Sequence, residues 1–359
     1  MFRNFKPAKL ISDYQAYVLV ILIFILGFQT ENFYTTFNFT SIFNSTMLIA
    51  MMGAGFTICL IAGQLDLSVG AIANTAGVVV MGMHTLQGFS WTQAFIAAII
   101  VGTLIGIING FLVGKAKIHS FITTLGMSFV LRGLMFIYIR WAGGDAEIGT
   151  GGKFEFTSFL RSRVVPDMIG SWEVPAVFTM FTWQVFIALV CVIVLAVLLT
   201  KTRWGRNIYM VGGNPETAWL AGIKRDFSII STFAVSGFFC AVGGAMFAVV
   251  LGSAQPLLGE AGIPPLMVAL TATIIGGTSV AGGIGSVWKT YVAVFGLMAM
   301  FNVLTPLVGR FEIVILANGL VLAACVLYET IRVYFANKKI GIRTTLVEEH
   351  IRESEKKKK

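Results

Sequence analysis

Ten apolar stretches dominate the sequence, and each is long enough to cross a lipid bilayer as a helix. About 20 apolar residues span the hydrocarbon core, and backbone polar groups in lipid are satisfied only within helices or closed barrels. A transmembrane barrel would show short segments of alternating polarity instead. The sequence therefore predicts an all-α, polytopic membrane protein with about ten transmembrane helices. The expected spans lie near residues 14–30, 41–62, 68–86, 93–113, 120–140, 181–200, 227–252, 266–283, 288–308 and 311–334.

The composition supports lipid as the solvent for most of the chain. Of the 359 residues, 57% are hydrophobic and only 12% are charged, whereas soluble domains carry about 25% charged residues. Ordinary soluble enzymes, secreted disulfide scaffolds and disordered proteins are thereby excluded. The 39 glycines indicate close helix packing, because small residues let helix backbones approach each other in lipid. The four cysteines and three histidines are dispersed, so we expect no disulfide, no metal site and no catalytic cluster.

The distribution of lysine and arginine orients the predicted helices. Cytoplasmic loops of membrane proteins are enriched in basic residues, and a cytoplasmic N-terminus places 20 of the 26 Lys and Arg on that side. Ten spans return the chain to the same face, so both termini are predicted to be cytoplasmic. The expected organisation is a transmembrane domain over 1–335, with an inside loop at 201–226 and an outside loop at 141–180. A charged cytoplasmic tail follows at 336–359.

The inside loop contains the signals of a short, capped helix. Asn214 is a good N-cap, Pro215 suits the first helical position, and Glu216 places an acid in the first turn. Gly222 can end the helix. A helix of this kind on the cytoplasmic face suits docking to another protein. The alternative is a surface helix that only joins two spans.

A polar segment at 63–70 interrupts the apolar pattern between the second and third spans. It contains Asp66 with a glycine at each end. An ionisable group at membrane depth is expensive and marks a functional candidate, but Asp66 could equally cap the next helix. A second interruption, at 276–285, holds five glycines and predicts a broken helix in the second half of the chain. Paired broken helices are one way to line a membrane pathway with backbone groups.

Four segments occur in an order typical of one family. They are GQLDLSVG at 63–70, NGFLVGKAKIHSFITTLG at 109–126 followed by Arg132-Gly133, TRWGRNIYMVGGNPETAWLAGI at 202–223, and IGGTSVAGGIGSVWKT at 275–290. With these motifs the chain resembles the permease subunits of bacterial ATP-binding-cassette (ABC) importers for simple sugars, of the ribose, xylose and galactose type. The resemblance covers roughly residues 40–330.

The resemblance implies a role for the short helix and a set of partners. In the family this loop is the coupling helix that docks on the ATPase subunit. The residues concerned are Asn214, Pro215, Glu216, Thr217, Ala218 and Gly222, of which Thr217 stands where alanine is common. The implied partners are an ABC ATPase, a periplasmic sugar-binding protein and a second permease subunit, in lipid of the bacterial inner membrane. The chain lacks a G-x-x-x-x-G-K-[ST] loop, so ATP and magnesium are expected in the ATPase and no cofactor here.

A neutral sugar needs hydrogen-bonding groups along its path. The candidates are Gln64, Asp66, Ser68, Asn74, Asn109, Thr123, Thr124 and Arg132. Each has an alternative role, because polar residues in spans commonly bond a neighbouring helix, and Arg132 could belong to a buried structural pair. The stretch 265–268 lacks the acids common in the family, and Gln64 replaces a frequent glycine. These departures leave the identity of the sugar open.

Two other functions remain as hypotheses. A secondary transporter could use Asp66 to couple a proton or sodium ion, but such proteins usually carry several ionisable residues at the midplane, and here Asp66 and Arg132 are the main candidates. A membrane-embedded enzyme would need clustered histidines, acids or nucleophiles near one face. The sequence shows no such cluster.

Overall fold

The chain folds mainly into helices, as the apolar stretches predict. The computed structural model describes residues 7–144, 147–149, 155–165, 168–169, 172–173, 175, 179–257, 264–310, 312–324, 326–327 and 331. It divides into two units, Met1–Ile315 and Leu316–Lys359. The predicted tail at 336–359 lies outside the described residues and stays a prediction.

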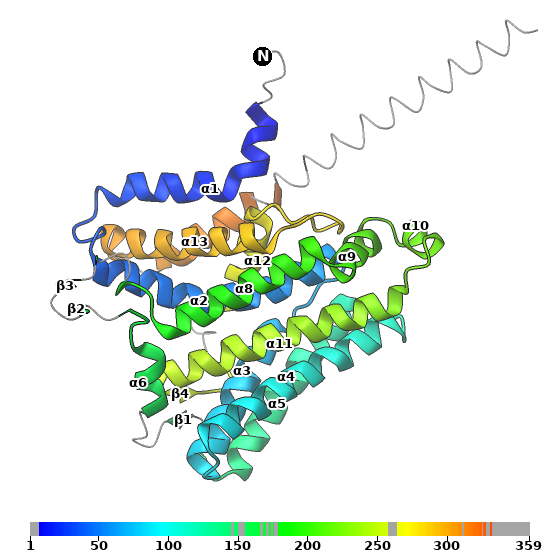
Figure 1. The fold of residues 1–359 in the computed structure, drawn as a ribbon, viewed down its shortest axis with the longest axis horizontal. Helices are drawn as coiled ribbons and strands as arrows, with labels where there is room; N and C mark the ends of the chain where they lie inside the picture. Colours follow the sequence, from blue (N-terminus) through cyan, green and yellow to red (C-terminus); the bar gives the residue numbers. More distant parts are fainter. Residues whose placement is uncertain are drawn as a thin grey trace, which may run out of the picture. The chain divides into compact units, whose positions relative to one another are not determined.

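The first unit consists mainly of helices, and longer connections follow α5, α6 and α11 (Figure 1). In chain order they are α1 (Pro7–Gly27), α2 (Thr36–Ile61), α3 (Val69–Met81), the π-helical turn η1 (Gly82–Leu86), α4 (Trp91–Gly114), α5 (Ser120–Trp141), α6 (Glu155–Arg161), α8 (Trp183–Lys201), α9 (Arg203–Gly213), α10 (Pro215–Leu220), α11 (Arg225–Leu251), α12 (Pro265–Ile275) and α13 (Val287–Val308). The strands are β1 (Ile148–Gly149), β2 (Met168–Ile169), β3 (Trp172–Glu173) and β4 (Ser253–Ala254).

Within the described part of the chain, seven helices are long and apolar enough to cross a membrane. They are α2, α3 with η1, α4, α5, α8, α11 and α13, and each coincides with a predicted span. The remaining three predicted spans fall on shorter apolar helices, Tyr14–Gly27, Pro265–Ile275 and Glu312–Ala324. The all-α membrane fold is thus confirmed, whereas the count of ten full spans is not.

The eighth span differs from the prediction in length. The span was predicted near 266–283, overlapping the helix break predicted at 276–285, and α12 ends at Ile275, immediately before that break. At 1.5 Å per residue, its 11 residues make a helix about 16 Å long, roughly half the hydrocarbon thickness. Gly277, Gly282 and Gly283 all have positive φ, which a right-handed helix cannot accommodate. The glycine-rich segment 276–286 is therefore a non-helical link between α12 and α13.

Helix α11 lies at the centre of the first unit and packs against α2, α3 and α4. Its contact with α4 has almost no side-chain layer. A Cβ atom added to Gly106 would lie 2.2 Å from the carbonyl oxygen of Phe233, and one added to Gly237 would lie 2.3 Å from that of Gly102. Such close approach of backbones explains the glycine content, since van der Waals contact holds helices together in lipid.

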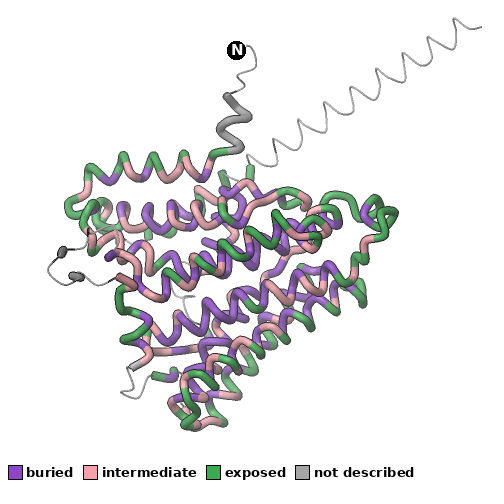
Figure 2. The backbone as a smooth tube through the Cα atoms, in the orientation of Figure 1, coloured by how far each residue is buried: buried purple, intermediate pink, exposed green. Residues whose placement is uncertain are grey.

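Helices differ widely in how much of their surface is buried within the bundle (Figure 2). In α2, 89% of the most apolar stretch is buried, against 33% in α5. The short strands lie at the end of the unit opposite α10 (Figure 1). There β1 pairs with β4 in antiparallel fashion, and the Thr157 hydroxyl of α6 donates to the carbonyl of Val249 at 2.9 Å. The predicted outside loop at 141–180 thus contributes to one end of the bundle, while the inside loop at 201–226 forms the other.

We expect Gly106→Ala to destabilise the contact between α4 and α11. Its methyl group would meet Phe233 backbone, and overpacking of this kind costs about 1–3 kcal/mol. The matched control is Gly126→Ala, because a Cβ there has no atom within 4 Å. In detergent, the unfolding temperature should fall by about 3–10 °C for Gly106→Ala and stay level or rise for Gly126→Ala. Equal unfolding temperatures would contradict the packing argument.

Candidate functional site

Helix α10 has the capped form that the sequence predicts. The Asn214 side-chain oxygen accepts hydrogen bonds from the backbone N–H groups of Glu216 and Thr217, at 3.1 and 3.0 Å. Pro215 occupies the first helical position, and Gly222 follows the helix with a φ of 77°. The Asn214 contacts satisfy two otherwise free N–H groups at the start of the helix. At its end, the N–H groups of Gly222 and Ile223 bond to the carbonyls of Trp219 and Ala218, at 2.9 and 3.0 Å. The capped-helix prediction is confirmed.

The exposed face of α10 combines two large apolar side chains with Glu216 and Thr217. Trp219 is 71% exposed and Leu220 is 77% exposed, whereas Ala218 is fully buried and anchors the helix on the rest of the fold. Large exposed aromatic and aliphatic groups are the usual anchors of protein interfaces. The helix therefore presents a small exposed apolar surface, formed by Trp219 and Leu220, with the Glu216 carboxylate on the same short helix.

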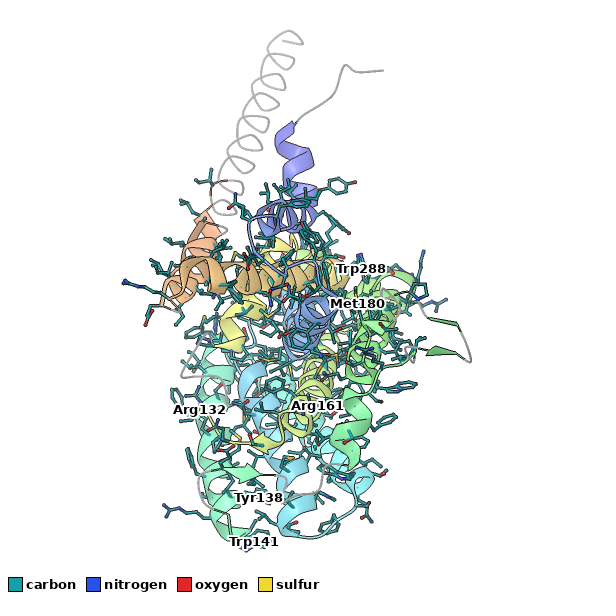
Figure 3. The ribbon with its side chains drawn as sticks, turned by 90° about the vertical axis from the view of Figure 1, so that its left-hand side faces the viewer. Arg132, Tyr138, Trp141, Arg161, Met180 and Trp288 are labelled. Atoms are coloured by element: carbon teal, nitrogen blue, oxygen red, sulfur yellow. The ribbon has the colours of Figure 1, made fainter. Side chains whose placement is uncertain are left out.

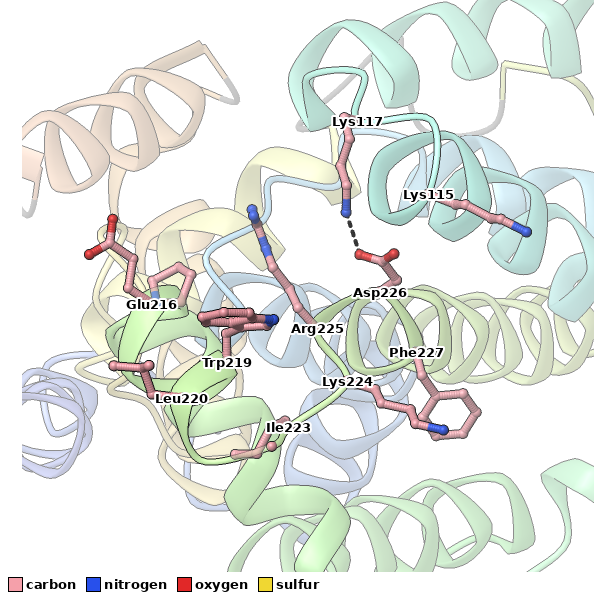
Figure 4. Close-up of a pocket in the computed structure, with 12 residues that line it drawn as sticks. Lys115, Lys117, Glu216, Trp219, Leu220, Ile223, Lys224, Arg225, Asp226 and Phe227 are labelled. Atoms are coloured by element: carbon pink, nitrogen blue, oxygen red, sulfur yellow. Dashed lines mark hydrogen bonds and ion pairs between the residues drawn. The ribbon is translucent and has the colours of Figure 1, made fainter.

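A groove of about 990 Å³ lies next to this face (Figure 4). One wall comes from the loop between α4 and α5, where Lys117 makes an ion pair with Asp226 of α11. Lys224, Arg225 and the exposed ring of Phe227 continue the wall along the start of α11. The described lining is completed by Lys115, Pro215, Glu216, Trp219, Leu220, Gly222 and Ile223. Four basic side chains against two acidic ones make the groove cationic.

The segment before α10 is tied to the second broken helix. Tyr209 of α9 donates its hydroxyl to the carbonyl oxygen of Gly285 at 2.9 Å. Burial raises the pKa of Tyr209 above its ordinary value, so the phenol keeps its proton and acts as the donor. The link joins the loop at 201–226 to the segment 276–286.

Asp66 lies in the break between α2 and α3 and is completely buried. Its Oδ1 atom accepts from the backbone N–H of Ser68 at 3.0 Å and from the Ser68 hydroxyl at 2.5 Å. Its Oδ2 atom accepts from the Ser236 hydroxyl of α11 at 3.1 Å. Asn109 of α4 donates to the Ser68 oxygen at 2.9 Å. Three of the predicted path residues, Asp66, Ser68 and Asn109, therefore meet in one buried network.

A row of hydroxyls on α5 binds the backbone of the same break. Ser120 accepts from the N–H of Leu65 at 3.1 Å, and Thr124 accepts from the N–H of Leu67 at 3.0 Å. Ser128 donates to the carbonyl of Leu67 at 3.1 Å. Sequence reasoning singled out Thr124 but missed Ser120 and Ser128. The available signal was their four-residue spacing, which places all three on one face of the helix.

Asn74 and Arg132 occupy a different place. They line a cavity of about 290 Å³ together with Ser128 and the first turn of α12, including Leu266 and Met267. The Arg132 guanidinium lies 5.7 Å from the ring centre of Phe129. Figure 3 shows Arg132 on the same helix as Tyr138 and Trp141. In this cavity, predicted path residues from α3 and α5 line the same open space.

The two remaining candidates, Gln64 and Thr123, join neither group. The backbone N–H of Gln64 bonds to the carbonyl of Cys59 at 2.9 Å, and the residue is partly buried. Thr123 is buried, and its hydroxyl has no hydrogen-bond partner among the described residues. Among the described residues there is also no group of three His, Cys, Asp or Glu side chains that could hold a metal ion.

Comparison with known proteins identifies the class of protein. Residues 38–331 match the family described as branched-chain amino acid transport system / permease component. The chain belongs to this permease family. The family match covers most of the helices described above, from α2 to the helix after α13.

Curated relatives of the permease are sugar transport proteins. The D-allose transport system permease protein AlsC of Escherichia coli K12 is 32% identical, covering 87% of this chain and 89% of its own. The ribose import permease protein RbsC of Haemophilus influenzae is 28% identical, over 94% and 98%. The fructose import permease protein FrcC of Rhizobium meliloti is 32% identical, over 75% and 72%. No solved structure matches. The resemblance to sugar importer permeases is thereby confirmed.

We expect Asp66→Asn to retain most transport activity. The asparagine oxygen can still accept from Ser68, and the Ser236 hydroxyl can turn to accept from the new amide. Asp66→Ala should instead reduce the folded amount, because each buried donor left without a partner costs about 1–3 kcal/mol. Expression, unfolding temperature and uptake are measured for both variants. Loss of uptake by Asp66→Asn at normal expression would show that the charge itself is needed.

Proposed function

We propose that the permease is the membrane-spanning subunit of an ABC importer for a simple, ribose-like sugar. The observation that carries the proposal is the similarity to allose, ribose and fructose permeases over three-quarters or more of the chain. A periplasmic binding protein would deliver the sugar to the strand-bearing end of the bundle. Two ATPase subunits, binding ATP and magnesium, would act at the α10 end.

The shape of α10 supports its role as the coupling helix. Trp219 and Leu220 project from a helix that is capped at both ends and held by buried Ala218, so the exposed groups are pre-organised. Pre-organised apolar anchors bind well because little conformational freedom is lost on association. In this proposal Glu216 and the cationic groove supply charge complementarity, which mainly sets specificity and association rate.

The cavity beside Arg132 is proposed as part of the sugar path. Asn74, Ser128 and Arg132 offer hydrogen-bonding groups there, and α12 contributes apolar walls. A pathway between two permease subunits would place such groups at a shared interface, and we propose a homodimer. The buried network around Asp66 then has a supporting role, since it holds the break between α2 and α3 rather than facing the cavity.

The proposal includes orientation and location. With α10 in the cytoplasm, the permease would be a multi-pass protein of the bacterial inner membrane with both termini inside. The basic residues of the α10 groove agree with the excess of positive charge on cytoplasmic faces. The comparisons lend no support to an ion-coupled carrier.

The first experiment is purification of the permease from native membranes in mild detergent, with mass spectrometry and an ATPase assay. Co-purification of an ATPase subunit with measurable hydrolysis is expected. A preparation free of any nucleotide-binding partner, combined with sugar uptake that collapses with an uncoupler, would refute the importer proposal. Uptake would then be assigned to ion coupling.

Glu216→Lys tests the docking face. The substitution reverses the one acid on the exposed side of α10 without removing the cap at Asn214, so the variant should insert and fold normally. We expect ATPase co-purification and sugar uptake to fall at least tenfold. The control for ATPase co-purification is Glu31→Lys, an exposed acid between α1 and α2 at the end of the first unit opposite α10 (Figure 1). Undiminished ATPase binding and uptake by Glu216→Lys would contradict the coupling role.

A further inference from the structure

Three segments far apart in sequence meet next to α10, backbone against backbone. They are the end of α2 at Ile61–Gly63, the end of α9 at Gly212–Gly213, and the link between α12 and α13 at Gly282–Gly285. The N–H of Gly283 donates to the carbonyl of Ile61 at 2.8 Å. We call these segments the glycine junction.

No side chain separates the backbones in the glycine junction. A Cβ atom on Gly212 would lie 1.8 Å from the Ile61 carbonyl oxygen. One on Gly282 would lie 2.6 Å from the Gly212 oxygen, and one on Gly283 would lie 2.5 Å from the Gly213 Cα. Side chains at ordinary contacts can absorb a small displacement by changing rotamer, but directly touching backbones cannot. A shift of any one segment must therefore displace the others.

The connection between helix α10 and the glycine junction is only one residue long. Asn214 is both the C-cap of α9 and the N-cap of α10, so a single residue separates Gly213 from Pro215. The Tyr209 hydroxyl adds a hydrogen bond to Gly285 from one turn earlier on α9. A push on α10 is thus delivered to α9 and to the glycine junction in the same movement.

The other ends of the segments lead to the candidate sugar path. Ile61 is followed by the break that contains Asp66 and then by α3, which brings Asn74 to the cavity. The link at 276–286 follows α12, whose first turn contributes Leu266 and Met267 to the same cavity. Each break therefore connects the glycine junction to a helix, α3 or α12, that lines the cavity.

We propose that the glycine junction transmits the movement of α10 to both broken helices, with Gly212 and Tyr209 as positioning residues for transport. This proposal rests on the proposed importer function. Nucleotide-driven displacement of α10 shifts Gly212 against Ile61 and pulls on Gly285 through Tyr209. The walls formed by α3 and α12 move in response, and access to the cavity changes. Neither residue contacts the cavity itself among its described lining.

The test compares two neighbouring glycines of α9. Gly212→Ala forces the backbones apart. Gly213→Ala is the matched control: Gly213 belongs to the junction through its Cα, but a Cβ on Gly213 would have its nearest neighbour 3.7 Å away, at ordinary contact distance, and would displace none of the three segments. Each variant is co-purified with its ATPase, reconstituted with the binding protein in vesicles, and assayed for ribose taken up per ATP hydrolysed. We expect this ratio to fall at least fivefold for Gly212→Ala while the ATPase stays bound. Gly213→Ala should remain within twofold of wild type.

Tyr209→Phe decides the question if Gly212→Ala does not assemble. It removes one hydroxyl and keeps the ring, so folding should persist, and the uptake per ATP should fall about two- to fivefold. If the Gly212→Ala complex assembles and its uptake per ATP equals that of wild type, the role of the glycine junction is overturned. If the Gly212→Ala complex does not assemble, a wild-type uptake per ATP in Tyr209→Phe overturns it. Neither result would affect the proposed importer function. A wild-type complex that hydrolyses ATP without sugar uptake would refute the proposed function instead.

Discussion

Interrupted helices inside a lipid-facing bundle expose backbone groups that lipid cannot hydrogen-bond, and the rest of the structure depends on how these groups are satisfied. At the first break the partners are side chains. Ser120, Thr124 and Ser128 of α5 bind the backbone of Leu65 and Leu67. Asp66 meanwhile accepts from Ser68 and from α11. One short irregular segment thereby fixes the relative positions of several surrounding helices.

The second break is held differently, because its glycines let backbone groups contact and hydrogen-bond one another directly. Gly283 donates to Ile61, so the two breaks share a hydrogen bond, and Gly212 fits against the same carbonyl group only because it lacks a Cβ. Helix α10, the proposed docking helix, thus lies next to both interruptions. This proximity gives the proposed importer a short mechanical route from a docking helix to a membrane-embedded cavity.

The sequence was most informative where structure depends on neighbouring residues. The cap of α10 follows from Asn214, Pro215 and Gly222 alone, and the long apolar helices follow from their length and composition. For the eighth span it placed the helix break at 276–285 but extended the span to 283, because apolar and small residues continue past Ile275, where α12 ends. It also missed Ser120 and Ser128, since their four-residue spacing places them on one face of the helix but does not show which backbone groups that face meets.

The sequence by itself determined the class of fold, the lipid environment, the places where helices break and the presence of a capped helix in one loop. These properties arise from local interactions and from overall polarity, both of which are readable along the chain. Only the tertiary structure decided which polar residues face open space and which bind one another. Asp66 and Arg132 look alike in sequence as charges within apolar surroundings, yet Asp66 is enclosed by donors from Ser68 and from α11 while Arg132 lines a cavity. That difference depends on contacts between residues more than 100 positions apart, which no local pattern encodes.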